Sequence, residues 1–150
     1  MIVFVPLLLE PQYYCALSDA CLGQGRVTEA AEAAQQALEL ACEHEGPREV
    51  AMAWRALGTA ISAGSAPLDA LPCFEESARL FAESGALGER ARTLRAWAFH
   101  AKRHANLTQG DALLREARAI FTQLGLSHEL ARTSELRDVP PPGQTGIEPA

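Results

Sequence analysis

Apolar and small residues recur every three or four positions through most of the chain, which is the spacing of one face of an α-helix. Turn-forming residues such as Gly46 and Gly85 interrupt this pattern at intervals. Thr28, and Thr108 with Asp111, are the expected N-terminal caps of two helices. The pattern predicts helices over about 11–23, 28–44, 48–63, 67–84, 88–104, 108–124 and 128–137.

The pattern also repeats itself at a spacing of 40 residues. A fixed period between about 20 and 50 residues is typical of stacked helical arrays, in which each unit buries its apolar face against its neighbours. Positions of one kind fall in register in three successive units: Tyr14, Trp54 and Leu94; Leu17, Leu57 and Trp97; Ala34, Phe74 and Leu114; Ala37, Ser77 and Ala117; Ala51, Ala91 and Ala131.

Each unit resembles a tetratricopeptide repeat, whose pattern is W-x2-L-G-x2-Y followed by a small residue, an aromatic residue and alanine. The second unit matches the pattern most closely and the third is degenerate. The matching positions are Tyr14, Leu17, Ser18, Cys21, Ala30, Ala34 and Ala37; Trp54, Leu57, Gly58, Ile61, Ala70, Phe74 and Ser77; and Leu94, Trp97, Ala98, Ala101, Gly110, Leu114 and Ala117.

The period of 40 is similar to that of the longer repeats in bacterial signalling proteins, such as MalT-like transcription regulators, nucleotide cyclases and some Ser/Thr kinases. The resemblance covers residues 12–137 and implies an all-α, right-handed superhelical stack of three hairpins, over about 12–47, 48–87 and 88–126. The helix over 128–137 would then cover the end of the stack, with Ala131 and Leu136 against the last hairpin.

The two ends of the chain differ from this pattern. Residues 1–11 begin with the apolar run MIVFVPLLL, which has no basic start or cleavage site and is too short to cross a bilayer. We interpret it as the remnant of a preceding helix or as an apolar edge for self-association, so the chain is either the end of a longer protein or a short adaptor. The Pro-rich tail, 138–150, is expected to be disordered.

Charge and cysteine usage restrict the function further. The formal net charge is −6, yet residues 90–118 hold seven basic and two acidic side chains, and residues 1–89 hold four basic and 13 acidic ones. The basic stretch is therefore a candidate binding feature. The four cysteines show no CxxC spacing and lie among small residues, which favours a reducing, cytoplasmic location.

The resemblance implies a concave groove lined by the first helix of each hairpin. Arg55 and Arg95 share a repeat position, and with Arg92 and Lys102 they would clamp a carboxylate-bearing peptide, with Phe99 as an apolar anchor. The alternative is that these are solvated arginines on an ordinary helix face. The groove would present Cys15, Asp19, Leu22, Met52, Arg55, Thr59, Ser62, Arg92, Arg95, Phe99, Lys102 and Arg103.

Other chemistry has weaker support. The two-asparagine clamp of chaperone-binding family members is absent, since Asp19, Thr59 and Phe99 stand at its positions. His100 and His104 share a helix face but lack a third ligand, and the pair Cys42 and His44 is no stronger, so we expect no metal and no cofactor. No nucleophile–base arrangement and no phosphate-binding loop is present in the sequence, so the chain is not expected to be an enzyme.

The sequence thus favours a scaffold or regulatory adaptor that binds an acidic or extended peptide, or a neighbouring domain, in the groove. Two alternatives stay open. One is an effector-sensing or oligomerisation segment of a larger transcription regulator, cyclase or kinase. The other, less favoured, is nucleic-acid binding through residues 90–118, because stacking aromatics are scarce there.

Overall fold

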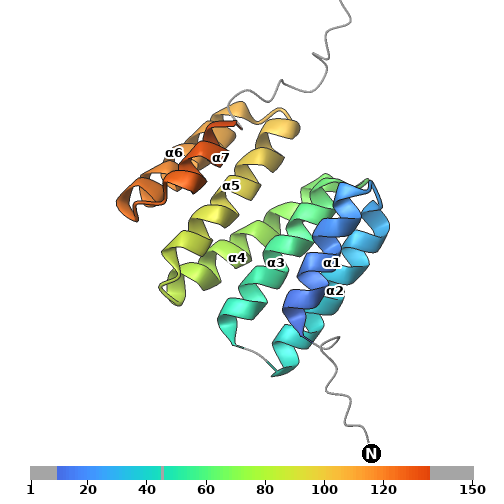
Figure 1. Ribbon diagram of the computed structural model, residues 1–150. Helices are drawn as coiled ribbons and strands as arrows, with labels where there is room; N and C mark the ends of the chain where they lie inside the picture. The colour runs from blue at the N-terminus through green and yellow to red at the C-terminus, as the bar shows by residue number, and fades with distance from the viewer. Residues whose placement is uncertain (1–9, 45, 136–150) are drawn as a thin grey trace, which may run out of the picture. The chain divides into compact units, whose positions relative to one another are not determined.

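The computed structural model describes residues 10–44 and 46–135, and within these ranges the chain is all helical, without a strand. It forms two compact units that meet in sequence between Ala86 and Leu87 (Figure 1). Unit 1 contains α1 (Pro11–Gly23), α2 (Val27–His44), α3 (Pro47–Ser62), a short 3-10 helix (Pro67–Asp69) and α4 (Ala70–Glu83). Unit 2 contains α5 (Leu87–Arg103), α6 (Leu107–Gln123) and α7 (Ser127–Glu135).

The helices predicted from the sequence are present, and their ends differ in detail. Thr28 lies inside the first turn of α2 instead of preceding it. Asn106, and not Thr108, caps α6, because its Oδ1 accepts a hydrogen bond from the backbone N–H of Gln109 at 3.2 Å. The apolar run 1–9 and the tail 138–150 lie outside the described residues, as do positions 136 and 137 of the last predicted helix.

Small residues let the helices of unit 1 approach one another closely. Ser18 on α1 is buried, and its hydroxyl donates to the carbonyl of Ala30 on α2 at 2.8 Å. At Gly58 on α3, a Cβ atom would lie 3.1 Å from both the Cβ of Cys73 and a ring carbon of Phe74, both on α4. These are the small positions of the repeat pattern, and the large Phe74 fills the space that they leave.

The same arrangement holds between α5 and α6 in unit 2. Ala98 and Gly110 bring the two helices together, since a Cβ on Gly110 would lie 3.3 Å from the carbonyl oxygen of Ala98. Leu94, Leu114 and Phe121 are buried around this contact. Gly58 and Ala98, which are 40 positions apart, therefore both lie where two helices of their own unit approach closely.

The helix α7 departs from the expected packing. It lies alongside α5 and α6 (Figure 1), but Ala131 is exposed and Leu136 lies outside the described residues. Among the residues of α7 whose burial is described, the buried ones are Glu129 and Thr133, both polar. The expectation that Ala131 packs on the last hairpin is therefore wrong, because the helix turns a polar face, and not its alanine, toward α5.

None of the helices among the described residues is both long enough and apolar enough to cross a bilayer.

Candidate functional site

One stripe of α5 carries four of the residues predicted for the groove. Arg92, Arg95, Phe99 and Arg103 follow one another at spacings of three or four, which places them on one side of the helix. Phe99 is 36% exposed, and the guanidinium of Arg103 lies 5.6 Å from the centre of its ring. We call these four residues the α5 stripe. It combines cationic groups with an accessible aromatic ring.

The carboxylate of Glu129 on α7 lies against the first half of the α5 stripe. The Nε of Arg92 donates to its Oε1 at 3.1 Å, and Nη1 of Arg95 donates to its Oε2 at 2.5 Å. Only 7% of Glu129 is exposed. Arg92 also pairs with Glu89 on its own helix. Two arginines therefore converge on one buried carboxylate, which is the strong form of ion-pair hydrogen bonding.

The electrostatics of this contact follow from its geometry. Burial disfavours the charged form of Glu129, but hydrogen bonds and charge from Arg95 and Arg92 outweigh it and hold the pKa of the carboxyl below its usual value. Thr133 supports the same turn, because its hydroxyl donates to the carbonyl of Glu129 at 2.7 Å. The carboxylate is thus ionised and fixed in place at neutral pH.

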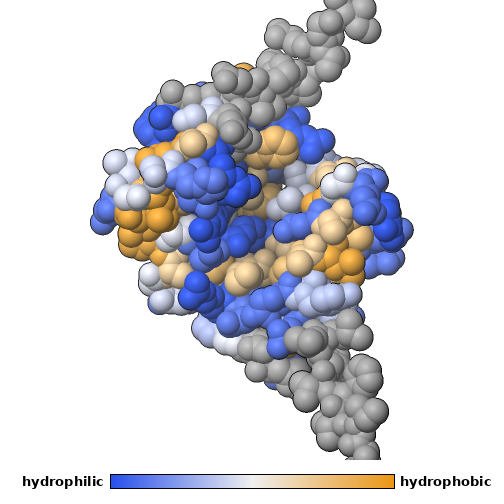
Figure 2. Space-filling view, in the orientation of Figure 1, coloured by the Kyte–Doolittle hydropathy of each residue, from blue (hydrophilic) through white to orange (hydrophobic). Residues whose placement is uncertain are grey.

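Polar side chains dominate the surroundings of this contact. Figure 2 shows hydrophilic side chains over α7 and a hydrophobic patch where α6 turns into α7. Leu124, which is exposed, lies in that turn, and Leu126 and Leu130 are half-buried. The helix α7 therefore attaches to unit 2 through a polar contact with α5 and a small apolar contact.

The structure places Lys102 apart from the α5 stripe. Its Nζ lies 2.8 Å from Oδ1 of Asp111 on α6, and most of its side chain is covered. The aliphatic part of Lys102 passes over Gly110, where a Cβ would collide with its Cγ. Lys102 thus joins α5 to α6 through its chain and its charge.

Four other predicted groove residues, Asp19, Met52, Arg55 and Thr59, lie in unit 1. The guanidinium of Arg55 lies 5.4 Å from the ring centre of Phe81, and Arg95 has the same relation to Phe121 at 5.4 Å. The hydroxyl of Thr59 donates to the carbonyl of Arg55 at 2.9 Å, and Met52 is half-buried. The repeat thus gives the arginine at this position the same aromatic neighbour in both units.

Cys15 and Asp19 share the neighbourhood of Arg55. Burial and the nearby Asp19 raise the pKa of the Cys15 thiol to about 11, against the opposing effect of Arg55. Burial also raises the pKa of Asp19, again against the effect of Arg55. A thiol with this pKa is protonated at neutral pH, so Cys15 lacks the thiolate that nucleophilic catalysis requires.

Of the two histidines, His100 is packed into unit 2 and His104 is exposed. The rings of His100 and His104 are 4.7 Å apart between centres, and His100 is buried. Burial, His104 and Arg103 together lower the pKa of His100. Among the residues that the structure describes, no three His, Cys, Asp or Glu side chains gather as a metal site would require.

Glu129 and Thr133 were missed by sequence reasoning, although one signal was available. Glu49, Glu89 and Glu129 stand at the same repeat position, 40 residues apart. A carboxylate that recurs at one position of a repeat is a candidate partner for the arginines that recur at another.

Comparison with protein-family models, with curated proteins and with solved structures found no match to this chain.

Proposed function

We propose that this chain is a non-enzymatic protein–protein interaction module, built as a right-handed stack of three tetratricopeptide-like hairpins. The all-helical fold supports the repeat architecture, as do Arg55 and Arg95, which lie 40 positions apart and have equivalent aromatic neighbours. Repeat proteins of this kind present a preformed helical surface, and their function is usually to bind another protein.

The observation that carries the proposal is the carboxylate of Glu129 between Arg92 and Arg95. It supports the α5 stripe as a surface that can hold a carboxylate in a fixed geometry. Phe99 and Arg103 continue the stripe toward the C-terminal end of α5 and are exposed. We infer that the partner is an acidic segment whose apolar side chain packs on Phe99 while its carboxylates reach the arginines.

In this proposal α7 acts as an internal competitor for the partner. The described part of α7 has nine residues, fewer than an isolated helix needs to be stable in water, so we infer that it depends on its contacts with α5 and α6. A partner carboxylate that takes the place of Glu129 keeps both arginines paired. The cost of displacing α7 is then limited to its small apolar contact.

Selection from a phage-displayed library of Asp- and Glu-rich peptides tests this proposal. The wild-type chain is compared with a Phe99→Ser/Arg103→Glu variant and with an Arg115→Glu control, which makes the same arginine-to-glutamate change at an exposed site on α6. We expect the selected peptides to bind the first variant more than about ten-fold more weakly and the control with the wild-type affinity. Equal binding by all three proteins, at equal helical circular dichroism, would overturn the proposal.

A second candidate function is an effector-sensing or oligomerisation segment of a larger regulator. The observation that favours it is on α1, where Tyr13 is exposed and Leu17 is 38% exposed, whereas Leu57 at the equivalent position is 7% exposed. Another helix or another copy would cover this face. Sedimentation of a Tyr13→Ser/Leu17→Ser variant checks this, because an unchanged oligomeric state would remove its support.

Nucleic-acid binding through residues 90–118 is a third and weaker candidate. Arg90 pairs with Glu116 at 2.6 Å and Lys102 with Asp111 at 2.8 Å, so carboxylates of the same chain offset much of the local positive charge. Binding to duplex DNA with a steep dependence on salt would revive this candidate.

A further inference from the structure

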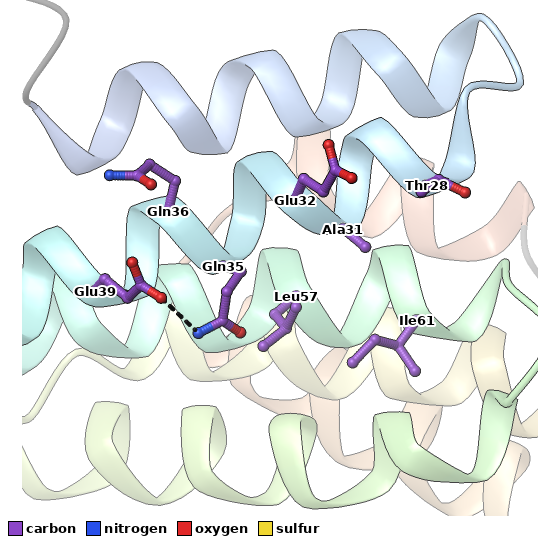
Figure 3. A pocket seen from close by; sticks show the side chains of 8 residues that line it. All are labelled: Thr28, Ala31, Glu32, Gln35, Gln36, Glu39, Leu57 and Ile61. Carbon is purple, nitrogen blue, oxygen red and sulfur yellow. Dashed lines mark hydrogen bonds between the residues drawn. The ribbon is translucent and has the colours of Figure 1, made fainter.

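A groove on unit 1 lies between α2 and α3, on residues that the proposed peptide site does not use. Its volume is about 430 Å³. Leu57 and Ile61 project into it from α3, and Ala31 lies on the α2 side (Figure 3). Leu57 is buried, whereas Ile61 and Ala31 are half-buried and leave apolar surface within reach of a partner.

Polar side chains of α2 line one side of the groove. Glu32, Gln35 and Glu39 follow one another along the helix (Figure 3), and Nε2 of Gln35 donates weakly to Oε1 of Glu39 at 3.5 Å. Glu32 and Glu39 are two turns apart, about 10 Å along the helix axis at 1.5 Å per residue. All three side chains are exposed.

The surrounding charge leaves these carboxylates without a cation of their own. The described residues of unit 1 contain four arginines, no lysine and eleven acidic residues. Arg26 pairs with Glu29, and Arg79 pairs with Glu76 and Glu83, all outside the groove. No arginine lines the groove, and none of the described cations makes an ion pair with Glu32 or Glu39.

We infer that this groove binds a basic amphipathic helix of a partner protein. Its aliphatic side chains would pack on Ile61 and Ala31, above the buried Leu57, and its lysines or arginines, two turns apart, would pair with Glu32 and Glu39. An apolar floor beside unpaired carboxylates complements a cationic helix and repels an acidic one. This surface shares no residue with the α5 stripe, and the two lie in different units.

Fluorescence anisotropy with three synthetic helical peptides tests the inference on the full chain. The first peptide carries leucines at i and i+4 flanked by lysines seven positions apart. The second has glutamates in place of the lysines, and the third is a scramble of the first. We expect the wild-type chain to bind the first peptide and neither of the others.

Charge reversal on the protein separates this groove from any other acidic surface. A Glu32→Lys/Glu39→Lys variant should bind the lysine peptide about ten-fold more weakly and should gain binding of the glutamate peptide. Glu75→Lys, an exposed reversal on α4 away from the groove, is the matched control and should bind as the wild type does. Binding of the glutamate peptide by the Glu32→Lys/Glu39→Lys variant is a result that a misfolded variant would not give.

Three results would overturn the inference. They are the absence of lysine-peptide binding to the wild-type chain, binding that the reversal leaves unchanged, and dimers of the chain alone that the reversal dissociates. The last result would assign the groove to a second copy of this chain. The two sites can be tested separately, because the Phe99→Ser/Arg103→Glu variant changes the α5 stripe and no residue that lines the α2–α3 groove.

Discussion

Arg95 on α5 and Glu129 on α7 form the ion pair that joins the last helix to its unit, with Nη1 and Oε2 2.5 Å apart. The pair is largely buried, and Arg92 completes it from the preceding turn of α5 at 3.1 Å. The helix α7 therefore depends on charge pairing more than on apolar burial, which distinguishes it from the other helices of unit 2.

Reversal of Glu129 should detach α7. In a Glu129→Arg variant the new guanidinium faces Arg92 and Arg95, and we expect the loss of about 1.5–3 kcal/mol of local stability, the range for hydrogen bonds to charged groups. Hydrogen exchange should then show α7 amides unprotected while α5 and α6 keep their protection. The swapped variant Arg95→Glu/Glu129→Arg should recover part of this protection. Equal protection of α7 in wild type and Glu129→Arg would show that the pair does not hold the helix.

The same contact should weaken in acid. The pKa of Glu129 lies below its unfolded value of 4.5, so its ion pairs stabilise the folded state above that pH and are lost as pH falls through the folded pKa. We expect α7 to lose hydrogen-exchange protection below about pH 4.5, and a Glu129→Gln variant to lack this dependence. The pKa of Asp19 in unit 1 is raised, so its protonation favours the folded state and has the opposite sign. If the Glu129→Gln variant loses α7 protection over the same pH range as the wild type, groups other than Glu129 cause the acid transition.

A strained turn offers a gain in stability. Gly25 and Ala105 share a repeat position and both have positive φ, 72° and 63°. An alanine pays a steric cost in this region that a glycine does not. Ala105→Gly should therefore raise the free energy of unfolding by about 0.5–1 kcal/mol, and Gly25→Ala should lower it by a similar amount. Denaturant melts of both variants check this. Changes in the free energy of unfolding that have the same sign in both variants would be inconsistent with the turn geometry.

The approach of α5 and α6 depends on Gly110. A Cβ there would lie 2.6 Å from Cγ of Lys102 and 3.3 Å from the carbonyl oxygen of Ala98. Gly110→Ala should destabilise unit 2 by about 1–3 kcal/mol, as overpacking does. Gly23→Ala is the control, because nothing lies within 4 Å of a Cβ at that position of α1. Thermal melts that show equal effects of the two substitutions would mean that the helices separate easily.

Local patterns predicted most of the fold. Helical spacing and turn residues were sufficient for the helices, because α1 to α6 each end at a glycine, proline or polar cluster that stops a helix whatever surrounds it. The 40-residue register identified the position shared by Ala34, Phe74 and Leu114, all of which are buried, but it did not reveal that Leu17 is exposed whereas the equivalent Leu57 is buried. The prediction of Thr108 as the cap of α6 was wrong. Asn106 and Thr108 are both residue types that cap helices, and the backbone geometry selects Asn106.

The candidate site was only partly predictable. The sequence placed Arg92, Arg95 and Phe99 on one helix face, which depends on spacing alone. It did not reveal that Glu129 pairs with both arginines, because that contact joins helices more than 30 residues apart in the chain. Nor did it reveal the α2–α3 groove, whose existence depends on how two helices pack rather than on any motif.

The most direct test of the central claim is whether the α5 stripe binds a carboxylate supplied by another molecule. The full-length Glu129→Arg variant, with its own α7 repelled, is titrated with a peptide of residues 126–135 and followed by NMR at the Nε–Hε groups of Arg92 and Arg95. We predict that both signals shift with this peptide and not with its Glu129→Gln form. Signals that stay in place, or that shift equally with both peptides, would contradict the claim that these arginines form a carboxylate-binding surface.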